Sequence, residues 1–338
     1  MLSHPTGARL NTLAALPGLT PESYRRHGLH GDNAAWPEKN CYADLWIGFL
    51  HTLGLEPLAM LPFTVAVDFE GDQWTFFKPP LTELRRLYGV DVQELTIWRP
   101  LIEHAREQLG AGKLISTESD AFWLPDTAGT DYRRSHTKTT ILMADLDLGR
   151  ERLGYFHNAG YYELEGEDFR RLFRLDAEPD PAFMPLFAEV VRIDRLVRRS
   201  ASDLADLSFE LLQQHFAWRP RANPFSRFSA RLAQDLPAMR AEGLAFYHQW
   251  AFASVRQAGA AFELLAANLR WLAQQGYPEL AEPAERFEAI GSANKTLILK
   301  GARAVNSGRP LAADDLLQGM AADWERGMAM LSNLLADG

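Results

Sequence analysis

Residues 36–53 read WPEKNCYADLWIGFLHTL, and this stretch predicts an amphipathic helix. Asn40 is of a residue type that caps helices, so the helix is expected to begin at Cys41 and to end before Gly54. Apolar residues then recur at helical spacing: Tyr42, Leu45, Trp46, Phe49, Leu50 and Leu53. The single cysteine of the chain is therefore expected in the first turn of a helix.

Two interpretations of Cys41 follow. Free cysteine is among the most buried residue types, so a structural role is the plainer one. Backbone N–H groups and the dipole at a helix N-terminus favour a thiolate, so a nucleophile is the other. A histidine and an asparagine further along the chain favour the second interpretation.

The composition excludes several classes of function. The chain has 338 residues, enough for one large domain or two ordinary ones, and a formal net charge of -9. That charge argues against nucleic-acid binding, which normally needs a basic face. No apolar run approaches the roughly 20 residues that span a bilayer, and the N-terminus lacks the pattern of a secretory signal, so no membrane contact is expected. One cysteine and no signal predict a cytoplasmic protein, and no metal site is expected.

The first half of the chain mixes helix and strand signals. Helices are expected at 41–53, 81–88 and 101–109, a hairpin at 63–69 and 73–77, an extended piece at 92–98, and strands at 114–123, 137–144 and 153–156. After about residue 180 only long Ala- and Leu-rich helical patterns remain, near 181–198, 201–216, 226–235, 239–274, 279–305 and 311–335. We therefore expect an α+β domain over 1–178 and an all-helical domain over 179–338, with the hinge at 176–181.

A cysteine nucleophile needs a base, and the base needs a group that orients it. His136 opens one expected strand, and Asn158 follows the next. If these strands pair as a hairpin that bends near Asp147, His136 and Asn158 become cross-strand neighbours. A cysteine at a helix start, then a histidine and an asparagine, is the chain order of papain-like folds. His157 competes with His136 for the role of base.

Several motifs resemble the N-terminal region of the butirosin biosynthesis protein H family, over about residues 35–175. They are Asn40-Cys41-Tyr42, Asp120-Ala121-Phe122-Trp123-Leu124-Pro125, His136 before a β-branched strand, Phe156-His157-Asn158, and Glu167-Asp168-Phe169. Residues 68–74, DFEGDQW, and 154–162, GYFHNAGYY, resemble a bacterial family associated with genes for amino acid:carrier-protein ligases. The second resemblance covers almost the whole chain.

The resemblance to the butirosin family implies a papain-like fold and acyl transfer from a carrier-protein thioester to an amine. Cys41 would be the nucleophile, His136 the base and Asn158 the orienting group. The third position is commonly Asp in that family, so Asp145 is an alternative to Asn158. The acyl donor would be a phosphopantetheine thioester, and no other cofactor is implied. The implied partners are an acyl or aminoacyl carrier protein and an amino acid:carrier-protein ligase.

Further residues are candidates for substrate binding. No Gln lies just before the cysteine, so Asn33 and Asn40 are the side-chain amides near Cys41 that could serve the oxyanion, and Asn40 is adjacent to it. The backbone N–H of Cys41 is a further expected donor. Asp120 and Asp126 could bind a substrate amine, or simply cap and turn the chain. An acidic carrier protein requires a basic surface, for which the candidates are Arg133, Arg134 and Lys138.

Two other functions use the same residues differently. A cysteine hydrolase, either a peptidase or an amidase, would admit water to the acyl-enzyme and release a free acid. A non-catalytic scaffold would keep the fold, bind a carrier protein or ligase, and leave Cys41 unreactive. The acyl group and its acceptor are not evident from the sequence.

Overall fold

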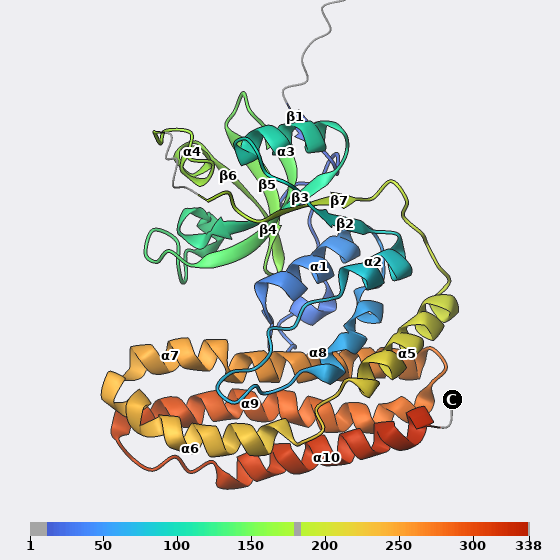
Figure 1. Ribbon diagram of the computed structural model, residues 1–338, viewed down its shortest axis with the longest axis vertical. Coiled ribbons are helices and arrows are strands. Elements are labelled where there is room, and N and C mark those ends of the chain that lie inside the picture. The colour runs from blue at the N-terminus through green and yellow to red at the C-terminus, as the bar shows by residue number, and fades with distance from the viewer. Residues whose placement is uncertain (1–11, 179–183, 337–338) are drawn as a thin grey trace, which may run out of the picture. The chain divides into compact units, whose positions relative to one another are not determined.

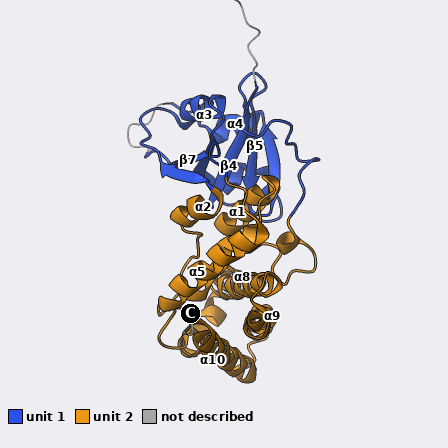
Figure 2. Ribbon diagram, turned by 90° about the vertical axis from the view of Figure 1, so that its right-hand side faces the viewer, with its two compact units in different colours: residues 1–26, 89–196 blue, residues 27–88, 197–338 orange. Residues whose placement is uncertain are grey.

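The computed structural model describes residues 12–178 and 184–336, in two compact units that are coloured separately in Figure 2. Unit 1 takes its described residues from 1–26 and 89–196, and unit 2 takes its own from 27–88 and 197–338. The sheet lies in unit 1 and the long helices in unit 2, which confirms the expected α+β class. The division at 178 and 179 stays a prediction, and the hinge expected at 176–181 extends beyond the described residues.

Unit 1 is built on an antiparallel sheet in the strand order β2-β7-β3-β4-β5-β6, with β1 pairing with β4 (Figure 1). The strands are β1 (Thr12–Ala14), β2 (Asp91–Glu94), β3 (Leu114–Asp120), β4 (Lys138–Asp147), β5 (Arg152–His157), β6 (Gly160–Glu165) and β7 (Ala188–Arg192). The strands expected at 114–123, 137–144 and 153–156 are confirmed as β3, β4 and β5, with β3 ending at Asp120.

Helices α3 (Leu101–Gly110) and α4 (Glu167–Leu172) complete the core of unit 1. Leu109 from α3 and Phe169 from α4 join one buried cluster with sheet residues such as Ile141, Met143 and Tyr155. Two short 3₁₀ turns, η3 (Ala121–Trp123) and η4 (Pro125–Thr127), follow β3 and lead towards β4. This packing fixes the ends of β3 and β4, where His136 lies.

Strand β7 corrects the helix expected at 181–198 and the all-helical second domain. Ala188–Arg192 pairs with β2 on one side and β3 on the other, inside the sheet. Val190 and Val191 are buried, and their β-branched side chains suit a strand packed on both faces. Ala, Glu and Arg around them are good helix formers, so local propensity favoured a helix and pairing with two distant strands overrode it.

Unit 2 contains the helix that carries Cys41 and the long helices of the second half. Its earlier elements are η1 (Gly28–His30), α1 (Cys41–Thr52), η2 (Pro57–Ala66) and α2 (Leu81–Tyr88). The later ones are α5 (Ala201–Ala217), α6 (Pro224–Glu242), α7 (Leu244–Ala253), α8 (Val255–Gln274), η5 (Pro278–Leu280), α9 (Ala281–Ser307) and α10 (Asp314–Ala336). Helix α9 packs against both α8 and α10 (Figure 1). The segment expected at 239–274 is three helices, broken at Gly243 and Ser254.

The hairpin expected at 63–69 and 73–77 is confirmed only at its turn, and the strand expected from residue 63 is wrong. Residues 57–66 form a 3₁₀ helix with Pro57 at its start and Pro62 inside it, and Phe69 with Trp74 makes only an isolated bridge. Trp74 packs on Phe225 and Phe228 of α6, with ring centroids 5.0 and 5.7 Å away. The apolar residues of this stretch are buried against helices on several sides, so their alternation did not mark a half-exposed strand.

Within the described residues, none of the helices is both long enough and apolar enough to cross a membrane.

Candidate active site

Cys41 is the first residue of α1, as predicted, and Asn40 is its N-cap. The Asn40 Oδ1 atom accepts hydrogen bonds from the backbone N–H of Tyr42 at 3.1 Å and Ala43 at 2.8 Å, and its Nδ2 donates to the carbonyl of Phe77 at 3.0 Å. The backbone N–H of Cys41 has no hydrogen-bond partner within the described part of the chain. Asn40 is therefore engaged in capping, and the Cys41 N–H is the amide that remains for an oxyanion.

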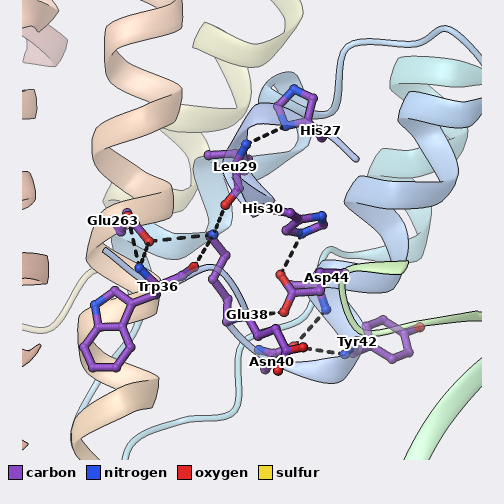
Figure 3. A network of polar contacts seen from close by, with 12 residues as sticks. His27, Leu29, His30, Trp36, Glu38, Asn40, Tyr42, Asp44 and Glu263 are labelled. Atoms are coloured by element: carbon purple, nitrogen blue, oxygen red, sulfur yellow. Dashed lines mark hydrogen bonds and ion pairs between the residues drawn. The ribbon is translucent and has the colours of Figure 1, made fainter. Parts of the chain in front are cut away.

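A buried lysine fixes the loop before Cys41. The Lys39 side chain is fully buried, and its ammonium donates to the carbonyls of Leu29 and Trp36, both at 2.6 Å, while lying 3.7 Å from a Glu263 oxygen. Burial lowers the pKa of Lys39, and the nearby Asp44 and Glu263 carboxylates oppose that shift. Glu263 on α8 also accepts from the N–H of Trp36 (Figure 3). The loop is thus tied to helix α8.

Asp44 connects this loop to the first turn of α1. Its Oδ2 accepts from the backbone N–H of Lys39 at 2.5 Å, and its Oδ1 lies 3.0 Å from His30 Nε2 (Figure 3). The side chains of His30 and Asp44 are completely buried. A buried carboxylate that lost these partners would carry a large desolvation cost, so the network holds the start of α1 in one position.

Arg256 on α8 places a guanidinium near Cys41. Its Nε and Nη2 donate to the carbonyl of Glu38 at 3.1 and 2.9 Å, and the group lies 4.3 Å from the ring centre of Phe252. Burial lowers the pKa of Arg256, and the nearby Asp44 and Glu38 carboxylates oppose that shift. The half-buried Cys41 thiol is therefore within electrostatic range of a fixed cation.

His136 lies in unit 1, two residues before β4, and its partner is Asp120 at the end of β3. His136 Nδ1–H donates to Asp120 Oδ2 at 2.6 Å, while Asp120 Oδ1 accepts from the N–H of Phe122 at 3.0 Å. The imidazole stacks on the Phe122 ring at 4.3 Å with 10° between the planes. The His136 side chain is 68 % exposed, and its Nε2 bonds to none of the residues described. Asp120 fixes the tautomer that leaves Nε2 as an acceptor.

The expected pairing of His136 with Asn158 is wrong. In the antiparallel β4–β5 register, Leu142 lies opposite Phe156. Asn158, two residues after Phe156, is therefore level with Thr140, two residues before Leu142, and not with His136. Asn158 lies in the turn between β5 and β6 with φ 46°, a conformation that asparagine tolerates better than most residues. Asp145, the alternative, pairs with Arg152 at 2.7 Å. Asp120 takes the orienting position instead.

A second histidine–aspartate pair is buried in the same unit. His157 Nδ1–H donates to Asp126 Oδ2 at 2.6 Å, and His157 Nε2 accepts from the Thr139 hydroxyl at 2.7 Å. Tyr155 donates to the other Asp126 oxygen at 2.5 Å, and burial followed by the Asp126 charge raises the pKa of Tyr155. The side chains of His157 and Asp126 are 1 % and 2 % exposed. Asp126 is therefore not open to a substrate amine.

A pocket of about 350 Å³ lies beside His136, entirely within unit 1. Asp120, His136 and Lys138 line it together with Arg171. Much of the remaining wall is apolar and includes Trp123 and Met143. The pocket brings a histidine with an available ring nitrogen next to a space that a small molecule can enter, which is the arrangement of a general base.

Comparison with protein families identifies the chain. The family model of the DUF1839 N-terminal domain matches residues 25–193, and that of the DUF1839 C-terminal domain matches residues 201–333. The chain belongs to the DUF1839 family. No curated protein matches it. The match to the DUF1839 N-terminal domain contains Cys41, His136 and Asp120, and it extends through β7.

The basic residues expected to bind a carrier protein also lie in the DUF1839 N-terminal domain. Arg133 pairs with Asp168 at 2.5 Å, and Lys138 pairs with Glu118 at 2.8 Å. Arg134 is exposed, and its side chain makes no hydrogen bond or ion pair with the residues described. Two of the three expected cations are thus neutralised by carboxylates of the same unit.

Sequence reasoning missed Arg256 as a neighbour of Cys41 and Asp120 as the partner of His136. Arg256 lies in a helical run far along the chain, and nothing local distinguishes it. The pair of His136 and Asp120 had a usable signal, because consecutive antiparallel strands bring the end of one beside the start of the next. Among residues 12–178 and 184–336, no group of three or more His, Cys, Asp or Glu side chains could hold a metal ion.

Proposed function

We propose that the protein is a thiol-dependent acyltransferase in which Cys41 is the nucleophile and His136, oriented by Asp120, is the general base. The observation that carries this proposal is the His136–Asp120 pair, whose Nε2 is available beside a pocket. An oriented imidazole with one open nitrogen is the base that a thiol mechanism requires. The resemblance to a papain-like family supports the roles of Cys41 and His136, whereas the orienting role of Asp120 rests on its hydrogen bond to His136.

The reaction has two steps. The Cys41 thiol gives its proton to His136 Nε2 and its sulfur attacks the carbonyl carbon of a thioester, forming a new C–S bond. The donor sulfur leaves with the electron pair of the broken C–S bond and takes the proton back from His136. An acceptor amine then attacks the acyl–Cys41 carbonyl, His136 Nε2 takes the proton that the amine loses, and the Cys41 sulfur leaves. Exchange between two thioesters is close to isoenergetic, so a thioester donor suits a thiol nucleophile.

Features of unit 2 support the role of Cys41. Negative charge develops on the carbonyl oxygen during each attack, and the Cys41 sulfur carries negative charge before the first attack and again as it leaves in the second step. The first turn of α1 offers an uncommitted N–H at Cys41, and Arg256 adds a fixed positive charge nearby. Both features favour negative charge at this position. The buried ties of Lys39 and Asp44 keep these groups in place without movement during the reaction.

The donor in this proposal is a carrier-protein thioester, and the carrier protein is the proposed partner. A phosphopantetheine arm can deliver a thioester from a protein surface to a half-buried thiol. Because Arg133 and Lys138 are paired with carboxylates, Arg134 is the expected cation that remains for an acidic carrier. The association with an amino acid:carrier-protein ligase stays a prediction.

The test is to incubate the protein at pH 7 with N-acetylcysteamine thioesters of several acyl groups and to follow its intact mass. We expect an acyl adduct on Cys41 that forms at least about tenfold faster than on N-acetylcysteine and is absent in Cys41→Ala. Acylation at the rate of a free thiol would contradict the proposal. Release of free acid without an acceptor would indicate the hydrolase instead.

Arg256 provides a matched pair of variants for the same assay. Arg256→Gln should slow acylation about tenfold or more, because it removes the cation near the reacting atoms. Arg270→Gln removes an equal charge from helix α8 at an exposed position, where Arg270 pairs with Glu288. It should leave the rate of acylation unchanged. Equal effects of the two variants would show that Arg256 has no special role.

A further inference from the structure

The walls of the pocket beside His136 indicate what enters it. Apolar side chains form much of its surface, namely Leu101, Trp123, Met143, Leu172, Phe173 and Leu186. Its volume of about 350 Å³ lies near the small end of the range for ligand pockets, which is roughly 300–1,000 Å³. Burying apolar surface there is favourable, so the pocket suits a compact molecule with one apolar group.

The charges in the pocket are not equally committed. Lys138 is paired with Glu118 at 2.8 Å, and Asp120 is paired with His136 at 2.6 Å. Arg171 on α4 is half-exposed, and its guanidinium is 3.9 Å from Glu167, too far for a hydrogen bond. Its planar donors are therefore available to a carboxylate on the ligand.

The opposite charge is also present near His136. Glu118 and Asp120 are two residues apart on β3, so their side chains leave the same face of the strand. Both line the pocket with His136. Lys138 and His136 already pair with these carboxylates, so the group at this end that remains for a ligand amine is His136 Nε2, whereas Arg171 favours an anionic group on the same ligand. The polar groups and the apolar walls of the pocket therefore fit a single ligand that carries an amine, an anionic group and an apolar group.

We propose that this pocket binds the acyl acceptor, an apolar amine that carries one carboxylate and has the size of a large apolar amino acid. The role of this ligand as the acyl acceptor rests on the proposed function, whereas its binding to the pocket does not depend on Cys41. Arg171 holds the carboxylate, the apolar walls hold the side chain, and the amine faces His136 Nε2. His136 then takes the proton that the amine releases when it attacks.

The experiment is calorimetric titration of the full-length protein, without any acyl donor, with three related probes. L-Phenylalanine carries both charged groups, phenethylamine lacks the carboxylate, and 3-phenylpropionate lacks the amine. We expect L-phenylalanine to bind at least about tenfold more tightly than either of the others, since each charge-assisted contact contributes about that factor. Equal affinities for the three probes, or no binding of any of them, would overturn the proposal.

Two arginines of helix α4 make the test specific. Arg171→Gln should weaken the binding of L-phenylalanine about tenfold and leave phenethylamine unchanged. Arg170→Gln removes the same charge from the same helix, but Arg170 pairs with Glu151 and Asp176 and does not line the pocket. It should bind all three probes as the wild type does. Loss of L-phenylalanine binding in both variants, or in neither, would overturn the assignment to Arg171.

Failure of this inference and failure of the proposed function are separate outcomes. The titration contains no thioester, so it is independent of acylation at Cys41. Binding of L-phenylalanine without any adduct on Cys41 would keep the pocket and remove the acyltransferase. An adduct on Cys41 without binding of the probes would keep the acyltransferase and remove this acceptor.

Discussion

Two histidines of unit 1 each donate from Nδ1 to an aspartate at 2.6 Å, but they differ in their exposure and in what the second ring nitrogen bonds to. His157 is 1 % exposed, and its second ring nitrogen accepts from Thr139. His136 is 68 % exposed, and its second ring nitrogen bonds to no described residue and lies beside a pocket. The same two residue types therefore build a buried, fully bonded pair in one place and, in our proposal, a reactive pair in the other. What decides the role is the state of Nε2.

The two pairs should also differ in how much they contribute to the free energy of unfolding. Asp126 and His157 are withdrawn from water, so their stability depends on every hydrogen bond of the network. Asp120 and His136 are largely hydrated, and exposed pairs of this kind contribute little to stability. Because the ring of His136 is held by Asp120 but should contribute little to the free energy of unfolding, we expect it to serve chemistry instead.

The largest effect is expected from breaking the buried pair. His157→Ala leaves the Asp126 carboxylate with Tyr155 as its only side-chain donor among the described residues and opens a cavity, so the free energy of unfolding should fall by about 3–5 kcal/mol. The measurement is urea-induced unfolding. His136→Ala is the matched control and should change the free energy of unfolding by less than about 0.5 kcal/mol. Equal midpoints for the two variants would remove the distinction between the pairs.

A smaller effect, on rate alone, is expected from the partner of the exposed histidine. Asp120→Asn keeps the hydrogen bond to Phe122 within reach but no longer fixes the His136 tautomer, so transfer from acyl–Cys41 to an amine should slow about 100-fold. Stopped-flow transfer rates measure this. Asp131→Asn changes a nearby carboxylate that accepts from Thr137, and it should transfer at the wild-type rate. An Asp120→Asn rate within a factor of two or so of wild type would contradict the orienting role.

The smallest effect concerns the nitrogen that distinguishes the pairs. Thr139→Val removes the hydroxyl that His157 Nε2 accepts from and leaves this nitrogen buried without a partner, at a cost of about 1–2 kcal/mol in unfolding free energy. Thr140→Val, on the next residue of β4, provides the control because no hydrogen bond of its hydroxyl is described. If both variants unfold at the same urea concentration, Thr139 does not support His157.

Local chemistry explains what the sequence predicted of the fold. The start of α1 was predictable because the Asn40 side chain caps it through hydrogen bonds to the nearby backbone N–H groups of Tyr42 and Ala43. Strand β7 was not, because Ala188–Arg192 has the composition of a helix and becomes a strand only between β2 and β3. The stretch at 63–77 failed for a related reason, since Phe69 and Trp74 pack on distant helix α6.

The candidate site follows the same division. Cys41 and His136 were singled out from residue type and position along the chain. The partner of His136 was assigned to Asn158 because the β4–β5 hairpin was expected to bend a few residues earlier than it does. A shift of register changes every cross-strand pair, and no local signal fixed it. Asp120 was expected to cap a turn, which it does, and also holds the imidazole.

In the proposed mechanism, acyl transfer from Cys41 to an amine depends on His136 acting as the base. The most direct measurement is the rate at which pre-formed acyl–Cys41 transfers its acyl group to an excess of a simple amine, in the wild type, in His136→Ala and in Asn158→Gly. We predict a loss of about 10²–10⁴-fold in His136→Ala. Asn158→Gly should keep the wild-type rate, because glycine readily adopts the positive φ of that turn. Transfer at the wild-type rate in His136→Ala, or an equal loss in Asn158→Gly, would contradict the account.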